Sequence, residues 1–141
     1  MNPQNGYDIE DISVGMSAGV SKTITEADIL LFSAVSTDTN AVHLDEEFGK
    51  TTMFGGRIAH GMLSAGFIST VLGTKLPGPG AIYLAQTLKF KAPVKIGDTV
   101  VTRCTIKELV PEKRKVKFDT ICTVRGKTVV EGEADIMVPA R

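Results

Sequence analysis

The sequence predicts an α+β fold in which a curved antiparallel β-sheet surrounds one long apolar helix. Two observations predict it: the seventeen residues Ile58–Thr74 contain no Asp, Glu, Lys or Arg, and four alternating, β-branched stretches follow them. The chain has 141 residues, of which 43% are hydrophobic. This length and apolar content suit one core, so we expect a single domain over residues 1–141.

The charge and cysteine content exclude several classes of protein. Sixteen basic residues balance sixteen acidic residues, so the formal net charge is zero. Proteins that bind nucleic acids or anionic membranes through bulk charge carry an excess of basic residues, so we expect neither partner. The two cysteines form no CxxC pair and are typical of buried, reduced thiols. The first residues lack a secretory signal, which favours a cytoplasmic protein.

The N-terminal third predicts one strand, one short helix and a long loop. Ser17–Thr23 is a candidate strand, and Thr25-Glu26-Ala27-Asp28 resembles a capping box that opens an amphipathic helix reaching Val35. Residues Ser36–Arg57 follow as a mostly irregular segment with its own polar cluster. Long loops of this kind frequently carry the functional residues of a domain.

The charge-free segment Ile58–Thr74 predicts a buried helix. It is shorter than the ~20 residues that cross a bilayer, and it contains His60 and several hydroxyl side chains. On a helix, Gly61, Ala65, Ser69 and Gly73 form a stripe of small residues, and large apolar side chains cover the other sides. We therefore expect the helix to be enclosed on nearly every face.

Four long strands are predicted after this helix. Short turns at Gly97-Asp98, Pro111–Lys113 and Arg125–Lys127 favour antiparallel neighbours. Cys104 and Cys122 belong to the apolar faces of their strands, which supports their assignment to the core. The predicted strands are Ala81–Lys91, Thr99–Val110, Lys115–Arg125 and Lys127–Val138.

A carboxylate and an imidazole lie five residues apart in the polar segment, at Asp38 and His43, with Asn40 between them. If the loop doubles back, both side chains can hold one water and move its protons, as general acid–base catalysis requires. The alternative is a turn in which Asp38 and Asn40 cap local backbone groups. Asp38, His43 and Asp45 lack the spacing of a known metal motif, so we expect no metal.

The start of the apolar helix, His60-Gly61-Met62, is a second candidate feature. The first N–H groups of a helix have no partner within it, and the helix dipole makes this end mildly positive, so a negatively charged oxygen is stabilised there. Glycine at position 61 lets a ligand approach, although close packing of helix and sheet is an equal explanation. For Ser64 and Ser69 we expect hydroxyls bonded to the carbonyl one turn back.

Several of these segments resemble one family when they are taken together in order. Ser36–Asp45 and Arg57–Leu63 resemble the hydratase signature of the MaoC-like (R)-specific enoyl-CoA hydratases, and Leu76–Tyr83 and Phe90–Asp98 resemble later segments of the same family. The resemblance extends from about residue 14 to residue 138. It implies the hot-dog fold, a long helix wrapped by an antiparallel sheet, which agrees with the fold predicted above.

The resemblance implies reversible addition of water to a trans-2-enoyl-CoA, which gives an (R)-3-hydroxyacyl-CoA. Asp38 then activates the water, and His43 holds it and takes part in protonating the α-carbon. Asn40 orients the loop, the Gly61 N–H binds the thioester carbonyl, and Ser69 supports the pair. Substrate-binding roles are expected for Arg57, His60 and Met62. Thr37 and Ala41 stand where the family commonly has Gly and Pro, which affects the shape of the loop.

No metal or redox cofactor is implied, because coenzyme A is part of the substrate. Its acidic nucleotide end requires local basic residues, for which Arg57, Lys89, Lys91 and Lys95 are candidates. The resemblance also implies a homodimer, or a higher homo-oligomer built from such dimers, with a sheet that continues across two subunits. Three alternatives remain open: an (R)-3-hydroxyacyl dehydratase acting on acyl carrier protein, a hot-dog thioesterase, and a catalytically silent acyl-CoA-binding or subunit-assembly module.

Overall fold

The computed structural model describes all 141 residues and contains one six-stranded antiparallel sheet. The strand order is β1-β4-β5-β6-β2, and β3 also pairs with β6. The strands are β1 (Ser17–Thr23), β2 (Ile82–Gln86), β3 (Lys89–Phe90), β4 (Thr99–Val110), β5 (Lys115–Val124) and β6 (Lys127–Met137).

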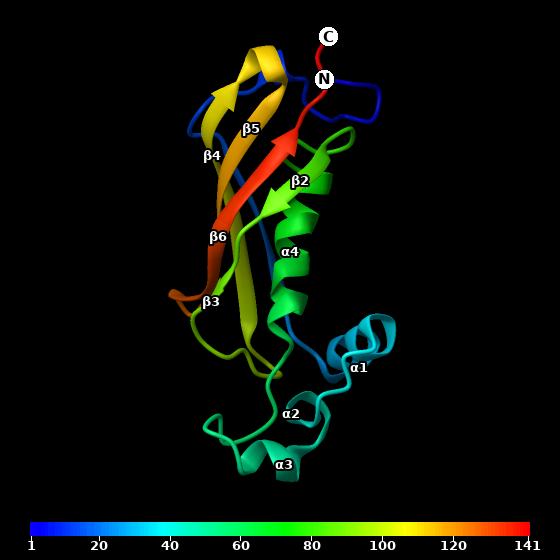
Figure 1. The fold of residues 1–141 in the computed structure, drawn as a ribbon, viewed down its shortest axis with the longest axis vertical. Coiled ribbons are helices and arrows are strands. Elements are labelled where there is room, and N and C mark those ends of the chain that lie inside the picture. The colour runs from blue at the N-terminus through cyan, green and yellow to red at the C-terminus, as the bar shows by residue number, and fades with distance from the viewer.

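One long helix lies against this sheet, and the shorter helices gather at its N-terminal end (Figure 1). The α-helices are α1 (Glu26–Ser36), α2 (Ala41–Leu44), α3 (Glu46–Lys50) and α4 (Gly61–Thr74), and two 3-10 turns are η1 (Ile9–Asp11) and η2 (Pro111–Lys113). The predicted α+β hot-dog arrangement is confirmed. None of the helices combines the length and the apolar character needed to cross a membrane.

The three strands from Thr99 onward follow the prediction to within one residue, because local turn chemistry separates them. Residues Arg125 and Gly126 both have positive φ, of 49° and 79°, as a two-residue hairpin turn requires. Buried and exposed side chains alternate along β5, from Val116 through Val124. The sheet therefore has one face on the core and one face towards solvent.

The predicted strand Ala81–Lys91 is wrong in one respect, since it is divided into β2 and β3. At the break, the Thr87 N–H donates to the Glu133 carbonyl, and the Thr87 carbonyl lies so close to Gly132 that a Cβ there would overlap it. The ladder with β6 is interrupted at this close backbone approach.

The core lies between α4 and the concave face of the sheet. From α4 it receives Ile68, Val71 and Leu72, all essentially inaccessible to solvent. Phe118 and other apolar side chains of β4, β5 and β6 contribute eleven more members to a cluster of 22 buried residues, and residues outside these elements supply the rest. Cys104 and Cys122 are both free and buried, as the alternating pattern predicts.

The apolar helix begins at Gly61, within the predicted start His60-Gly61-Met62. The charge-free residues Ile58 and Ala59 lie outside it, because the Ile58 N–H donates to the Val42 carbonyl and the Ala59 N–H donates to the Val94 carbonyl. The prediction that the helix is enclosed on nearly every face is wrong for this chain, in which it is covered on one side only. Its outward side is exposed at Met62, Gly66, Ser69, Thr70, Gly73 and Thr74.

The segment predicted to be mostly irregular contains two short helices, α2 and α3. Each begins at a side chain that caps it: the Asn40 Oδ1 accepts the Val42 N–H at 3.1 Å, and the Asp45 Oδ1 accepts the Phe48 N–H at 3.1 Å. These residues project beyond the sheet, next to the N-terminal end of α4 (Figure 1). We call residues 37–57 the overhang.

Candidate active site

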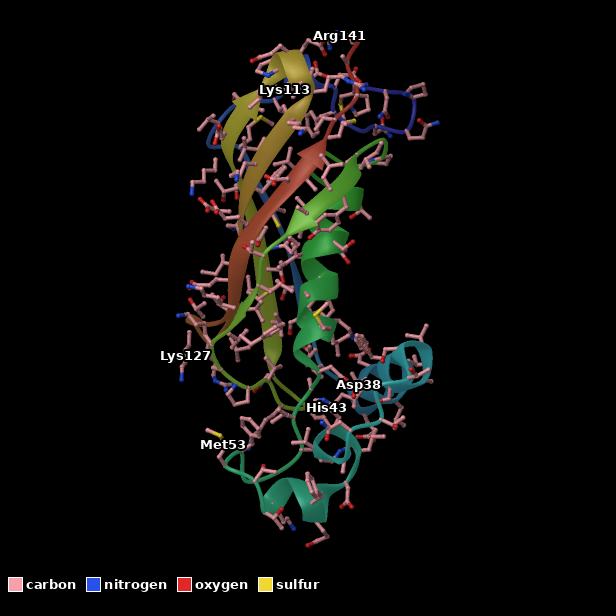
Figure 2. The ribbon with its side chains drawn as sticks, viewed as in Figure 1. Asp38, His43, Met53, Lys113, Lys127 and Arg141 are labelled. Carbon is pink, nitrogen blue, oxygen red and sulfur yellow. The ribbon has the colours of Figure 1, made fainter.

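His43 is held by α2 with its ring turned towards the start of α4. The ring Nδ1 lies 2.8 Å from the Ile58 carbonyl oxygen. Because a carbonyl only accepts, Nδ1 carries the hydrogen, and Nε2 keeps a lone pair that can accept a proton. Figure 2 shows His43 and Asp38 close together below the N-terminal end of α4. His43 is 8% exposed, so the ring is largely withdrawn from bulk water.

Asp38 lies on the exposed turn that leads from α1 to α2. Thr37 ends α1 with φ 64°, in the left-handed region. Glycine adopts this conformation more readily, but here threonine has it. The Asn40 N–H donates to the Asp38 Oδ1 at 3.2 Å, which orients the carboxylate. The local capping interpretation is therefore correct, and the same turn directs Asp38 towards His43. The Asn40 side chain caps α2, and its role in orienting the loop stays a prediction.

Three groups that carry or accept protons meet here, although they come from different parts of the chain. Single side-chain atoms of Asp38, His43 and His60 all lie within 4.8 Å of one another. The two imidazole rings are stacked, with centroids 3.8 Å apart and planes inclined by 26°. Nearly parallel rings direct their in-plane lone pairs side by side and not at one shared ion, so the cluster suits proton transfer better than metal binding.

The N-terminus of α4 forms the second part of the site. The His60 side chain does not cap the helix, and the N–H groups of Gly61 and Met62 make no hydrogen bond within the protein. The ring of Phe90 lies against Gly61, where a Cβ would come within 2.5 Å of the ring. Gly61 therefore serves close packing as well as leaving the amide accessible.

A cavity of about 520 Å³ joins these two parts. The predicted residues that line it are Asp38, His43, His60, Gly61 and Met62. Met53 and Phe90 also line it, as exposed apolar side chains in the overhang and on β3 that no sequence motif indicated. The full lining is Asp38, His43, Met53, Phe54, Ile58, Ala59, His60, Gly61, Met62, Ser64, Phe90, Lys91, Ala92, Pro93, Val94 and Val130.

Arg57 has a different place from the one predicted. Its guanidinium forms a bidentate ion pair with Glu26, at 2.8 and 3.1 Å, and its Nε donates to the His43 carbonyl at 2.7 Å. It does not line the cavity. With these donors engaged, Arg57 connects α1 to α2, and its substrate-binding role stays a prediction. Lys91 is the basic residue that lines the cavity, and its Nζ lies 3.6 Å from a Glu131 carboxylate oxygen.

The two helix serines also differ from their predicted roles. Ser69 is exposed on the outward side of α4, lies outside the cavity lining and makes no hydrogen bond to Asp38 or His43 in this chain. Ser64 lines the cavity instead, and its buried Oγ has no hydrogen-bond partner. The expected bond back along the helix is made by Thr70 and Thr74, which donate to the carbonyls of Gly66 and Thr70.

A family comparison accounts for this combination of site and fold. The model of the MaoC like domain matches residues 12–133. The chain belongs to the MaoC-like family. The match includes both parts of the site, the Asp38–His43 turn and the start of α4. The family resemblance predicted from the separated motifs is confirmed.

Relatives of this MaoC-like chain agree in sequence and structure. An (R)-specific enoyl-CoA hydratase of Rhodospirillum rubrum is 64% identical over 94% of this chain and 92% of its own length. A mitochondrial 3-hydroxyacyl-[acyl-carrier-protein] dehydratase of Solanum lycopersicum is 33% identical over 92% of this chain and 79% of its own length. The unliganded structure of an R-hydratase from Pseudomonas aeruginosa superimposes with a TM-score of 0.89 at 47% identity, covering 95% of this chain and 86% of the other.

Proposed function

We propose that the protein is an (R)-specific enoyl-CoA hydratase, a hydro-lyase that reversibly adds water to a trans-2-enoyl-CoA. One observation carries the proposal: Asp38, the His43 ring with its free Nε2, and the unpaired Gly61 N–H all face one cavity. An acid–base pair opposite an oxyanion donor is what hydration of a double bond conjugated to a thioester requires. The 64% identity to a hydratase supports the same function.

In the hydration direction, one water lies between Asp38 and His43. Asp38 accepts a proton from this water, the water oxygen bonds to C3, and the electron pair of the double bond moves towards the thioester oxygen. A proton from the Asp38–His43 pair then adds to C2, which returns both side chains to their starting state. The Nδ1–H bond to Ile58 keeps the His43 Nε2 available for the water throughout.

The N-terminus of α4 stabilises the negative charge that develops on the thioester oxygen. The N–H of Gly61 is unpaired, and the helix dipole of a 14-residue helix favours negative charge at this end. In other enzymes, removal of one such donor lowers kcat by about 10²–10³-fold. The oxygen has to share this space with the Phe90 ring, which lies against Gly61.

The reaction needs proton transfer and charge stabilisation, so we propose that it requires no metal or redox cofactor. Coenzyme A enters as part of the substrate. Among the four basic residues predicted for its recognition, Lys91 lines the cavity, whereas Lys95 donates to the Phe54 carbonyl at 2.9 Å. We expect Lys91 to lie nearest to the acidic part of the substrate. The substrate-binding role of Met62 remains a prediction. The cytoplasmic location of the protein also remains a prediction.

The test is the loss of ultraviolet absorbance when purified protein meets a short trans-2-enoyl-CoA in the presence of a chelator. We expect turnover with the (R)-3-hydroxyacyl-CoA as product.

Asp38→Asn should lower kcat by about 10²–10⁴-fold, because it removes the base. Asp38 is exposed, so the variant should fold normally. The matched control is Asp45→Asn, which keeps a helix cap and should retain activity. Near-native turnover by Asp38→Asn contradicts the proposal.

Dehydration of an acyl carrier protein substrate is the second candidate, and the relative from Solanum lycopersicum favours it. The chemistry at Asp38 and His43 is the same in both cases, so the carrier decides between them. Matched CoA and carrier-protein thioesters of one acyl chain should be compared by kcat/KM. Release of free thiol indicates a thioesterase, and tight binding without turnover indicates a silent binding module.

We further propose that two copies form a homodimer. Strand β2 is a sheet edge, and its side chains Ile82, Tyr83 and Leu84 are exposed, as is the outward side of α4 that includes Ser69. Exposed edges of this kind are normally covered, and a second copy provides a symmetric way to cover them. Light scattering should give twice the chain mass of 15.0 kDa. Ser69→Arg should shift the mass towards one chain, and a monomeric wild type contradicts the proposal.

A further inference from the structure

His60 is almost completely buried although it directly precedes the apolar helix. It is 2% exposed, and its ring is turned into the space between α1 and α2. Phe32 of α1 contacts its ring edge to face, with centroids 4.9 Å apart, and His43 of α2 stacks on its face. The ring thus lies at the junction of α1, α2 and the start of α4.

The hydrogen bonds of His60 define which ring nitrogen carries the hydrogen. The Nε2 lies 3.0 Å from the Asp38 main-chain carbonyl oxygen and 3.1 Å from the Ser33 Oγ. A carbonyl accepts only, so Nε2 carries the hydrogen and shares it between the two oxygens. The buried Nδ1 has no partner. A hydrogen on Nδ1 would be a buried, unpaired donor beside the His43 ring, which is the costlier arrangement.

The two histidines therefore have opposite tautomers while they are stacked. His43 carries its hydrogen on Nδ1, towards the Ile58 carbonyl, and His60 carries its hydrogen on Nε2, towards the Asp38 carbonyl. His60 in this way touches both members of the acid–base pair: it binds the main chain of Asp38 and supports the ring of His43. One face of the ring stacks on His43 and its Nε2 is bonded to the Asp38 main-chain carbonyl, so a single side chain contacts both residues.

We propose that His60 is a positioning residue, which as the neutral Nε2–H tautomer aligns Asp38 and His43 for proton transfer. This role replaces the substrate-binding role predicted from the sequence, and it rests on the proposed acid–base function of the pair. Misplacement of reacting groups by about 1 Å can cost about 10²-fold in rate. The ring contacts Asp38 through one hydrogen bond and His43 through one stacking contact. Two different substitutions can test these contacts one at a time.

The first experiment measures tautomers and does not depend on activity. The protein has two histidines, so the nitrogen resonances of both rings can be resolved in a long-range ¹H–¹⁵N spectrum at pH 7, with His60→Gln providing the assignment. We expect a protonated Nδ1 in His43 and a protonated Nε2 in His60. A protonated Nδ1 in His60, alone or together with Nε2, overturns the proposal.

The second experiment separates the two contacts by kinetics. His60→Gln keeps an N–H near the position of Nε2 and loses the ring, whereas His60→Phe keeps a flat ring and loses the donor. Each should lower kcat by about 10–100-fold with KM within about threefold of wild type, because the acid–base pair and not the substrate is displaced. Ser33→Ala removes the shared acceptor alone and should lower kcat less than either variant.

The outcomes distinguish this proposal from the function on which it rests. If wild type hydrates no enoyl thioester, the proposed function fails, and the tautomer measurement still tests the arrangement of the rings. If wild type is active and Asp38→Asn is inactive, but both His60 variants keep wild-type kcat, the positioning role alone is wrong. A raised KM with unchanged kcat would overturn it in favour of substrate binding. Unfolding midpoints near wild type confirm that both variants fold.

Discussion

The body of the sheet and α4 differs from the overhang in what holds it together. Of the 22 buried apolar residues in the core cluster, 14 belong to α4 and to the strands β4, β5 and β6 of the body. In the overhang, residues 37–57, the only buried residues are His43, Gly49 and Gly56. Its two short helices are instead held by side-chain caps and by main-chain bonds such as Ile58 N–H to the Val42 carbonyl.

This difference separates stability from chemistry. Burial of apolar surface is the main source of stability, so the body should determine the free energy of unfolding. The overhang supplies Asp38 and His43, and the body contributes the Gly61 amide at the point where the two regions meet. Functional loops commonly belong to the less stable parts of a domain. Substitutions in the core of the body should therefore lower stability more than activity, and substitutions at the cavity should lower activity more than stability.

The largest expected effect on stability comes from the body. Ile68 is fully buried between α4 and the sheet and lies outside the cavity lining. Ile68→Ala should lower the free energy of unfolding by about 2–5 kcal/mol, and Ile68→Val by about 0.5–1.5 kcal/mol, because each leaves a cavity. Urea unfolding measures both. Turnover per folded molecule should stay near wild type, and a matching loss of kcat would contradict the separation.

Gly61→Ala tests the point where body and overhang meet. The added methyl would lie 2.5 Å from the Phe90 ring, so it should displace that ring and obstruct the free amide. We expect kcat to fall by about 10²-fold, the magnitude seen when an oxyanion donor is lost, with a small change in stability. Steady-state kinetics on an enoyl-CoA measures it.

Combining Gly61→Ala with Phe90→Ala separates the two causes. Phe90 is about half exposed, so its removal should not unfold the protein. If the methyl group blocks the amide itself, kcat stays low in the double variant. Recovery of kcat would show instead that the displaced ring causes the defect.

Arg57→Ala tests the polar support of the overhang. It removes the ion pair with Glu26 and the hydrogen bond to the His43 carbonyl, which together connect α1 to α2. We expect a loss of about 1.5–3 kcal/mol in the free energy of unfolding, the usual contribution of a hydrogen bond from a charged group, together with a lower kcat. Lys50→Ala is the matched control, because its pair with Glu47 is exposed and should contribute about 0–1 kcal/mol. Equal effects of the two substitutions would contradict the role of Arg57.

The smallest expected effect is pH-dependent and concerns α1. Hydrogen bonding with the Lys22 ammonium, at 2.8 Å, lowers the pKa of Asp28 below its usual value. A carboxyl with a lowered folded pKa stabilises the protein above its unfolded pKa, and this stabilisation is lost as pH falls through the folded pKa. Asp28→Asn should therefore be less stable than wild type at pH 6, by under about 1 kcal/mol for an ion pair at the surface.

Urea unfolding of both proteins at pH 6 and in acid measures this difference. The gap between wild type and Asp28→Asn should narrow as the pH decreases, because protonated Asp28 loses its attraction for Lys22. A gap that is constant with pH would mean that the charge of Asp28 is not the cause. Enoyl-CoA turnover should be unchanged.

Most of the fold was predictable because its signals are local. The alternation along β5, the Arg125-Gly126 turn and the Thr25–Asp28 capping box each depend on residues close in sequence, and each is present in the structure. The division between β2 and β3 was not predictable, since it depends on the approach of Thr87 to Gly132, more than forty residues away.

The sequence by itself determined the α+β fold, the family and the residue types of the site, Asp38, His43 and Gly61. Periodicity, turns and motif spacing act over a few residues, so one chain is enough to predict them. Only the tertiary structure decided what those residues and their neighbours touch. It pairs Arg57 with Glu26, leaves Ser69 outside the cavity and stacks His60 on His43. The reason is physical: a side chain's partner depends on long-range packing and hydrogen bonding, which residue type and spacing leave undetermined.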